Sequence, residues 1–272
     1  MNALPPAVGR RWFGLGAAAI AGLAVSPARA QQGGSTLDAI QKRGSVRVGW
    51  GVIYPNMYRE PGKQDPVGFY VGFCDEMAKS LGVKLELVED NWSTMIAGLQ
   101  ANKFDVTIPL GITLPRAMSA TFSKAFLKGP VSLMIRKSDA EKYKQWKDID
   151  VSSARISVTL GSNADMFITR AMPNAQILRV KAAPDSITQL LTGRADAWAS
   201  PTESFPSVAA EQKDLMQIGG PIVGYSDTAF AVRFGDFAWR DWLSLFTTEM
   251  IETGALARLL KKYGRPDDII IQ

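Results

Sequence analysis

The chain has 272 residues, of which 46% are hydrophobic and 21% are charged, a composition typical of a globular protein with a sizeable core. It contains no histidine, which excludes a Ser-His-Asp triad, a Cys-His dyad and a histidine-ligated zinc site. Its single cysteine, Cys74, excludes an intrachain disulfide and every CxxC metal or redox motif. We therefore expect no bound metal and no cofactor.

The formal net charge of +5 is concentrated near the N-terminus. Arg10, Arg11 and Arg29 lie in the first 30 residues, which contain no acidic residue, so the remainder of the chain is close to neutral. That remainder has no run of Lys and Arg with interleaved aromatic residues. Nucleic acid is therefore not an expected partner.

Residues 1–30 have the pattern of an export signal. Arg10-Arg11 precedes an apolar stretch at 14–25, and Ala28-Arg29-Ala30 supplies the small-x-small pattern that signal peptidase cleaves. The paired arginines favour the twin-arginine route. A Sec signal or a retained membrane anchor is the alternative, although an anchor needs about 20 apolar residues and the stretch at 14–25 is shorter. We expect cleavage after Ala30 and a periplasmic protein without a lipid anchor.

In the first half of the mature chain, short apolar runs alternate with amphipathic stretches. The predicted strands cover 45–50, 84–88 and 104–108, and the predicted helices cover 73–81 and 93–102. Gly82 suits a left-handed helix C-cap, and Ser93 suits an N-cap. The order strand, helix, strand, helix, strand predicts a parallel sheet with crossover helices.

The same alternation restarts after a charged stretch at 137–150. The predicted strands cover 155–159, 177–180, 195–199 and 230–233, and the predicted helices cover 162–172, 185–191, 201–210 and 236–263, the last broken at Gly254. Crossings near 132–137 and 224–233 predict a first lobe wrapped around an inserted second lobe. We assign 31–135 with 226–272 to lobe 1 and 136–225 to lobe 2, with a ligand cleft between them.

Short motifs follow one another in a fixed order through nearly the whole mature chain. They are Leu37-x-x-Ile40, Gly68-Phe69, Leu81-Gly82, Trp92, Lys103-Phe104-Asp105-Val106, Ile112-Thr113-x-x-Arg116, Gly161-Ser162, Gly193-Arg194-Ala195-Asp196-Ala197 and Lys261-Lys262-Tyr263-Gly264. In this order and spacing they resemble the extracellular solute-binding proteins of the polar amino acid uptake family. The resemblance implies an α/β, type II periplasmic binding fold: two lobes, each a mostly parallel sheet flanked by helices, joined by a two-strand hinge.

Two motifs are candidates for binding an anionic group. In that family the arginine of T-x-x-R holds the ligand α-carboxylate, and Thr113 and Arg116 match this motif. A guanidinium can donate two parallel hydrogen bonds to a carboxylate, although an arginine here could also cap the following helix. The family also implies that Ser162, after Gly161, grips the same carboxylate at a helix start, where a plain N-cap is the alternative.

Aromatic side chains could stack on the rest of the solute. Tyr54 and Tyr58 lie near the Pro55 turn that follows the first predicted strand, and Trp92 precedes a predicted helix. Core packing is the alternative role for each of these rings.

The chain departs from the family where an acidic residue normally holds the ligand ammonium. That acid follows Asp196 by four or five positions, where Ser200-Pro201 stand in this chain. The segment between Asp105 and Arg116 is also one residue short, and the family's G-F-D-x-D motif has lost both acids. Because a buried ammonium without a carboxylate is costly, either the solute lacks a free α-ammonium or Glu203 or Asp227 replaces the usual acid.

These features predict a monomeric periplasmic binding protein, not an enzyme. It would deliver a small carboxylate-bearing solute, an amino acid or a related organic acid, to the membrane permease of an ABC importer. One alternative is an enzyme similar to cyclohexadienyl dehydratases, with Glu203, Asp227 or Asp165 as the acid or base. The other is an accessory protein that docks on a periplasmic dehydrogenase or sensor and has a cleft that no longer binds.

Overall fold

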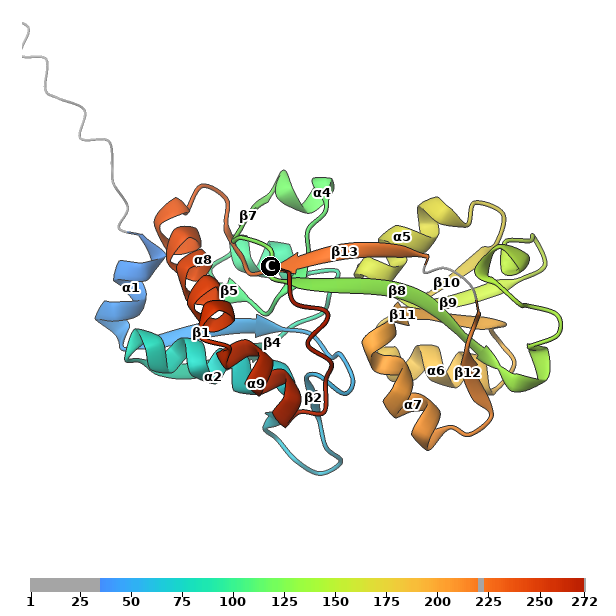
Figure 1. The fold of residues 1–272 in the computed structure, drawn as a ribbon. Helices are drawn as coiled ribbons and strands as arrows, with labels where there is room; N and C mark the ends of the chain where they lie inside the picture. The colour runs from blue at the N-terminus through green and yellow to red at the C-terminus, as the bar shows by residue number, and fades with distance from the viewer. Residues whose placement is uncertain (1–34, 220–222, 272) are drawn as a thin grey trace, which may run out of the picture. The chain divides into compact units, whose positions relative to one another are not determined.

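The computed structural model describes residues 35–219 and 223–271 (Figure 1). The predicted export signal and its cleavage site at Ala30 lie outside these residues.

Helices and strands alternate through most of the described residues. The α-helices are α1 (Thr36–Arg43), α2 (Phe69–Leu81), α3 (Met95–Gln100), α4 (Leu114–Ala117), α5 (Asn163–Ala171), α6 (Ala183–Leu191), α7 (Phe205–Glu211), α8 (Phe237–Glu252) and α9 (Ala255–Lys262), with 3-10 turns η1 (Lys137–Asp139), η2 (Trp146–Ile149) and η3 (Thr202–Ser204). The strands are β1 (Ser45–Trp50), β2 (Tyr58–Arg59), β3 (Pro66–Val67), β4 (Lys84–Glu89), β5 (Val106–Thr107), β6 (Leu110–Gly111), β7 (Ala120–Phe122), β8 (Leu127–Arg136), β9 (Arg155–Thr159), β10 (Gln176–Val180), β11 (Ala197–Pro201), β12 (Leu215–Gln217), β13 (Gly224–Ala229) and β14 (Ala231–Arg233).

The first sheet consists of three parallel strands in the order β4-β1-β5, as the alternation predicts. α2 begins four residues earlier than predicted, because the side chains of Phe69 and Tyr70 are also buried and extend its apolar face. It ends at Gly82, whose φ of 68° is the left-handed cap conformation.

Two local predictions in this half are wrong. Ser93 is not the N-cap of α3: the N-cap is Thr94, whose hydroxyl donates to Asp90 at 2.6 Å instead of capping the helix. The predicted strand at 104–108 shortens to β5, because only Val106 and Thr107 continue the ladder with β1.

Stacked phenylalanines form the centre of the first core. Phe73 is fully buried, and its ring lies 5.9 Å from that of Phe69, 5.2 Å from Phe126, 5.4 Å from Phe230 and 5.5 Å from Phe246. Phe69 lies in α2, Phe126 directly precedes β8, and Phe230 and Phe246 lie between β13 and the end of α8. Phe73 therefore packs residues from before β8 against residues from after β13.

The substitution Phe73→Ala is expected to lower the free energy of unfolding by about 3–5 kcal/mol, because the surrounding rings cannot collapse into the space left behind. Urea unfolding followed by circular dichroism measures the loss. Phe234→Ala is the matched control: this ring is 67% exposed, and its removal should change the free energy by less than about 0.5 kcal/mol. Equal losses in the two variants would contradict this assignment of the core.

The second sheet has seven strands, with β10-β9-β11-β8-β13-β6 in order and β12 also paired to β8. β9, β10 and β11 are parallel, whereas β8 and β13 run antiparallel to their neighbours. α5 and α6 pack on β9 and β11. This arrangement confirms the predicted strand-helix alternation of 155–199.

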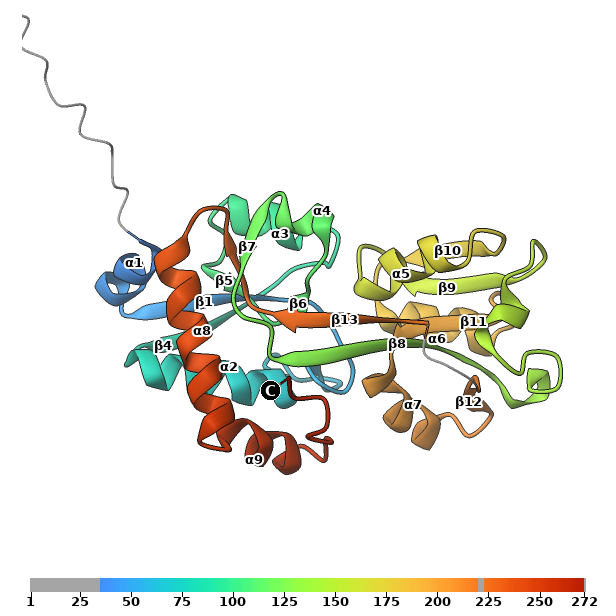
Figure 2. The same ribbon diagram turned by 45° about the horizontal axis from the view of Figure 1, so that its top comes forward.

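β8 and β13 lie side by side and carry the chain out of the first half of the fold and back into it (Figures 1 and 2). Their register joins Leu127 to Thr228 and Val131 to Gly224. They correspond to the predicted two-strand hinge. The largest buried cluster takes its residues from 40–127 and 230–260, and the second largest takes its residues from 131–218. The boundaries of the two lobes themselves stay a prediction.

Candidate functional site

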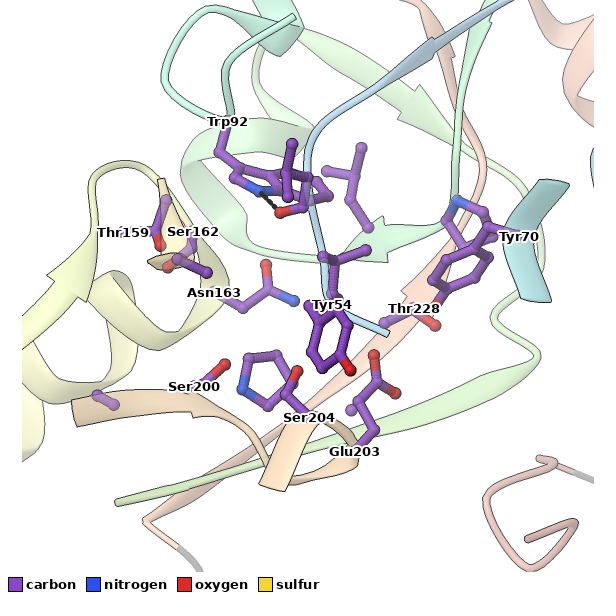
Figure 3. Close-up of a pocket in the computed structure, with 18 of the residues that line it drawn as sticks. Tyr54, Tyr70, Trp92, Thr159, Ser162, Asn163, Ser200, Glu203, Ser204 and Thr228 are labelled. Carbon is purple, nitrogen blue, oxygen red and sulfur yellow. Dashed lines mark hydrogen bonds between the residues drawn. The ribbon is translucent and has the colours of Figure 1, made fainter. Parts of the chain in front are cut away.

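A cavity of about 60 Å³ is lined by residues from both predicted lobes. Figure 3 shows Thr159, Ser162 and Asn163 on one side, Trp92 above, Ser200, Ser204 and Glu203 below, Tyr54 near the centre, and Thr228 and Tyr70 on the other side. Thr159 is the last residue of β9, and Ser162 and Asn163 lie where α5 starts; Ser200 lies near the carboxyl end of β11, and Ser204 lies in η3 just after it. Ligand sites of α/β sheets are found at such strand ends.

Arg116 is buried beside this cavity and is not part of its lining. Its Nη1 donates to the carbonyl of Gly111 at 2.8 Å and to Oδ1 of Asn163 at 2.6 Å, and its Nη2 donates to the carbonyl of Gly161 at 2.8 Å. No Asp or Glu oxygen of the described residues lies within 4.0 Å of it. Burial lowers the pKa of Arg116 to about 10, so the guanidinium remains a cation at neutral pH.

The turn at Gly161 and Ser162 is therefore in contact with Arg116. The prediction that both bind the same carboxylate requires this contact. Ser162 is the N-cap of α5, and its Oγ accepts from the backbone N–H of Asp165 at 3.2 Å. The two following N–H groups, of Asn163 and Ala164, make no hydrogen bond to the described chain and are free at the helix start. The contact between Asn163 and Arg116 was not predicted, because nothing in the sequence around Asn163 signals a contact with a residue 47 positions away.

The substitution Gly161→Ala is expected to weaken solute binding at least tenfold. Gly161 has a φ of 74°, and an added Cβ would lie 2.7 Å from the Cα of Ser93, so the turn could no longer approach Ser93. Gly193→Ala is the matched control, since Gly193 has a φ of 70° with no atom within 4 Å of an added Cβ.

Both glycine variants should lose about 1–2 kcal/mol of stability from the backbone conformation. Native mass spectrometry measures the fraction of protein that retains its co-purifying solute. This fraction should fall in Gly161→Ala and not in Gly193→Ala. A Gly161→Ala protein as fully loaded as Gly193→Ala would argue against the close approach of the turn to Ser93.

Glu203 lines the cavity, and its carboxylate is already occupied. Oε2 accepts from Nη2 of Arg265 at 2.6 Å, and Oε1 accepts from Nδ2 of Asn56 at 2.9 Å. Arg265 also donates to the side chain of Asn56. No sequence motif pointed to Arg265, which is 62 residues from Glu203 and follows the end of α9.

Two of the predicted aromatic residues line the cavity. The Trp92 indole N–H donates to the carbonyl of Val52 at 3.1 Å, which fixes the ring at the cavity wall. The Tyr54 phenol donates to Glu211, and this hydrogen bond is the main reason why the pKa of Tyr54 rises to about 12. Tyr58 packs edge-on against Tyr54 with ring centres 4.7 Å apart and does not reach the cavity lining.

The structure does not place Thr113 and Asp227 in the cavity. Thr113 is the N-cap of α4, where its hydroxyl accepts from the N–H of Arg116 at 3.4 Å. Asp227 is exposed on β13, because side chains alternate along a strand and its neighbour Thr228 faces the cavity. The predicted role of Asp227 as the acid that binds the solute is therefore not supported by its position.

Residues 35–219 and 223–271 contain neither a cluster of metal ligands nor a helix suited to cross a membrane. No group of three or more His, Cys, Asp or Glu side chains lies close enough together there to hold a metal ion. None of the helices formed by these residues combines the length and the apolar composition that crossing a bilayer requires.

Comparison with known proteins identifies relatives over most of the chain. Residues 46–266 match the profile of bacterial extracellular solute-binding proteins, family 3. The L-cystine-binding protein TcyJ of Escherichia coli is 23% identical over 85% of this chain and 86% of its own. The cyclohexadienyl dehydratase of Pseudomonas aeruginosa is 31% identical over 66% of each chain. Among solved structures, the fold is similar to that of the ancestral amino acid-binding protein AncCDT-1, which is a precursor of cyclohexadienyl dehydratase. The two structures superpose with a TM-score of 0.78 and share 27% sequence identity, and the match covers 84% of this chain and 99% of AncCDT-1.

These findings confirm the predicted family and the predicted two-lobed, type II α/β fold. They also agree with a binding protein and not an enzyme, because the family is one of solute-binding proteins and the dehydratase matches only part of the chain.

Proposed function

The chain belongs to the bacterial extracellular solute-binding proteins of family 3, and we propose that it delivers a small carboxylate-bearing solute to the permease of an ABC importer. The amino-acid transport names of its relatives support the importer as the partner. In this proposal the protein acts as a monomer in the periplasm, and binding involves no chemical step.

The observation that carries the proposal is the charge on Arg116. Burying a cation is costly unless an anion compensates it, yet Arg116 is 6% exposed and has only neutral acceptors in the described chain. Three of its five N–H donors are used, so two are left for another group. A carboxylate arriving from the cavity would supply the missing negative charge.

The neighbouring turn favours the same occupant. The free N–H groups at the start of α5 belong to Asn163 and Ala164, two and three residues after Gly161, whose carbonyl Arg116 contacts. The positive end of the helix and the guanidinium therefore belong to the same turn. Asn163, which lines the cavity and accepts from Arg116, would release the guanidinium when the solute binds. Affinity would then come from charge-assisted hydrogen bonds contributed by both predicted lobes.

The test is to identify the solute that the protein carries. The protein should be purified from the periplasm under native conditions, and the solute released by unfolding should be analysed by mass spectrometry. We expect a small carboxylic acid, which should raise the melting temperature when added back to refolded, solute-free protein. Release of a compound without a carboxylate, or of no small molecule at all, would count against the proposal.

A further inference from the structure

We infer that the solute carries a carboxylate but no ammonium group, so that it is a 2-hydroxy or 2-oxo acid and not an amino acid. This inference rests on the proposed function and refines its ligand. It follows from the charges and free polar groups that the described chain presents to the cavity.

The cavity offers no free negative charge. Glu203 is the one carboxylate among its described lining residues, and Lys128 is the one cation. The phenols of Tyr54 and Tyr70 stay neutral, since hydrogen bonding to Glu211 raises the pKa of the first and burial raises that of the second. Arg116 contacts the lining residue Asn163, so its positive charge lies close to the cavity and favours an anionic solute.

Glu203 is compensated within the protein. Its ion pair with Arg265 is largely shielded from solvent, with side chains 13% and 8% exposed, and Asn56 donates to its other oxygen. An ammonium placed beside this pair would gain little attraction, because the guanidinium of Arg265 cancels most of the carboxylate's field.

The carboxylates of Asp165, Asp227 and Glu211 do not line the cavity, and that of Glu211 accepts from the Tyr54 phenol. Asp165, in the first turn of α5, pairs with Arg179 at 2.8 Å and accepts from the N–H of Gly161 at 3.0 Å. Asp227 is exposed on the opposite side of β13. An ammonium would therefore lose its hydration without an acidic partner, at a cost of several kcal/mol by general experience with buried charges.

The cavity instead presents uncommitted hydroxyls. Thr159, Ser200 and Ser204 are 7%, 7% and 2% exposed, line the cavity, and make no side-chain hydrogen bond to the described chain. Figure 3 shows the two serines on the same side of the cavity. A hydroxyl can donate to a carbonyl oxygen and can both donate to and accept from another hydroxyl, so these groups suit a 2-oxo or 2-hydroxy substituent.

Matched pairs of acids test the inference. Refolded, solute-free protein should be titrated calorimetrically with L-alanine and L-lactate, L-leucine and 2-hydroxyisocaproate, L-phenylalanine and 3-phenyllactate, and L-glutamate and 2-hydroxyglutarate, together with the 2-oxo analogues. Within each pair that binds, the hydroxy or oxo acid should bind at least tenfold more tightly than the amino acid. An amino acid that binds more tightly than its analogues would overturn the inference and leave the proposed function intact. Failure of every acid, with no carboxylate released from native protein, would overturn both.

A variant at Ser200 tests the cause. Ser200→Asp places a carboxylate in the cavity wall and should shift the ratio of the two dissociation constants in a pair by at least tenfold toward the amino acid. Ser200→Asn matches the size of the aspartate and, like the serine hydroxyl, can donate and accept hydrogen bonds, but it carries no charge, so it should leave the ratio within threefold. An unchanged ratio in Ser200→Asp would overturn the inference. If that variant fails to fold, the matched pairs decide on the unsubstituted protein.

Discussion

Replacing Arg116 with lysine is expected to weaken binding of the co-purifying solute at least tenfold, and Arg116→Met is expected to abolish detectable binding. Lysine keeps the charge but not the planar fork of donors, so it cannot make two parallel hydrogen bonds to one carboxylate. Methionine removes the cation from a site where no described protein carboxylate compensates it. Truncating a buried, hydrogen-bonded charge pair typically costs about 2–5 kcal/mol, which is roughly 30-fold to several thousand-fold in affinity.

Isothermal titration with the solute identified from native protein measures the effect, and the melting temperature of the solute-free variants shows whether they fold. Arg194→Lys and Arg194→Met are the controls, because Arg194 is exposed and makes no side-chain hydrogen bond in the described chain. Undiminished affinity in Arg116→Met would mean that the guanidinium only supports the turn at Gly161, and the proposed carboxylate site would have to be abandoned.

The sequence predicted those parts of the fold that depend on local preferences. β1 and β9 begin and end where their apolar runs do, and Gly82 ends α2 in the left-handed conformation. Such features follow from periodicity and from the freedom of glycine, which act within a few residues. The family motifs then added the two-lobed type II fold with its two-strand hinge and singled out Arg116 and Ser162 as candidate site residues.

The site could be predicted only where a motif carried it. Sequence reasoning placed Glu203 near the solute but could not see that Arg265 neutralises it, because the pairing depends on how the segment after α9 returns to η3. It likewise offered Asp227 and Glu203 as equivalent acids, although strand alternation turns Asp227 outward. Contacts over long sequence separations therefore decided the charge of the cavity, and with it the class of solute that we infer.

Breaking the ion pair between Glu203 and Arg265 is expected to destabilise the protein by about 3–5 kcal/mol. Arg265→Met leaves a carboxylate in a poorly hydrated site with only Asn56 as a partner, and Glu203→Gln leaves the guanidinium without its anion. The double variant should lose clearly less than the sum of the two single losses, because it leaves no uncompensated charge. Urea unfolding of the four proteins gives the coupling free energy.

The pair between Lys79 and Glu76 is the control for this double-mutant cycle. Its side chains are 63% and 44% exposed, so Lys79→Met and Glu76→Gln should each leave the urea midpoint almost unchanged and show little coupling. Additive losses at Glu203 and Arg265 would mean that the two charges do not compensate each other. Glu203 would then be available to an ammonium, and the preference for hydroxy or oxo acids would lose its physical basis. A strong coupling instead ties the stability of the fold and the selectivity of the cavity to the same ion pair.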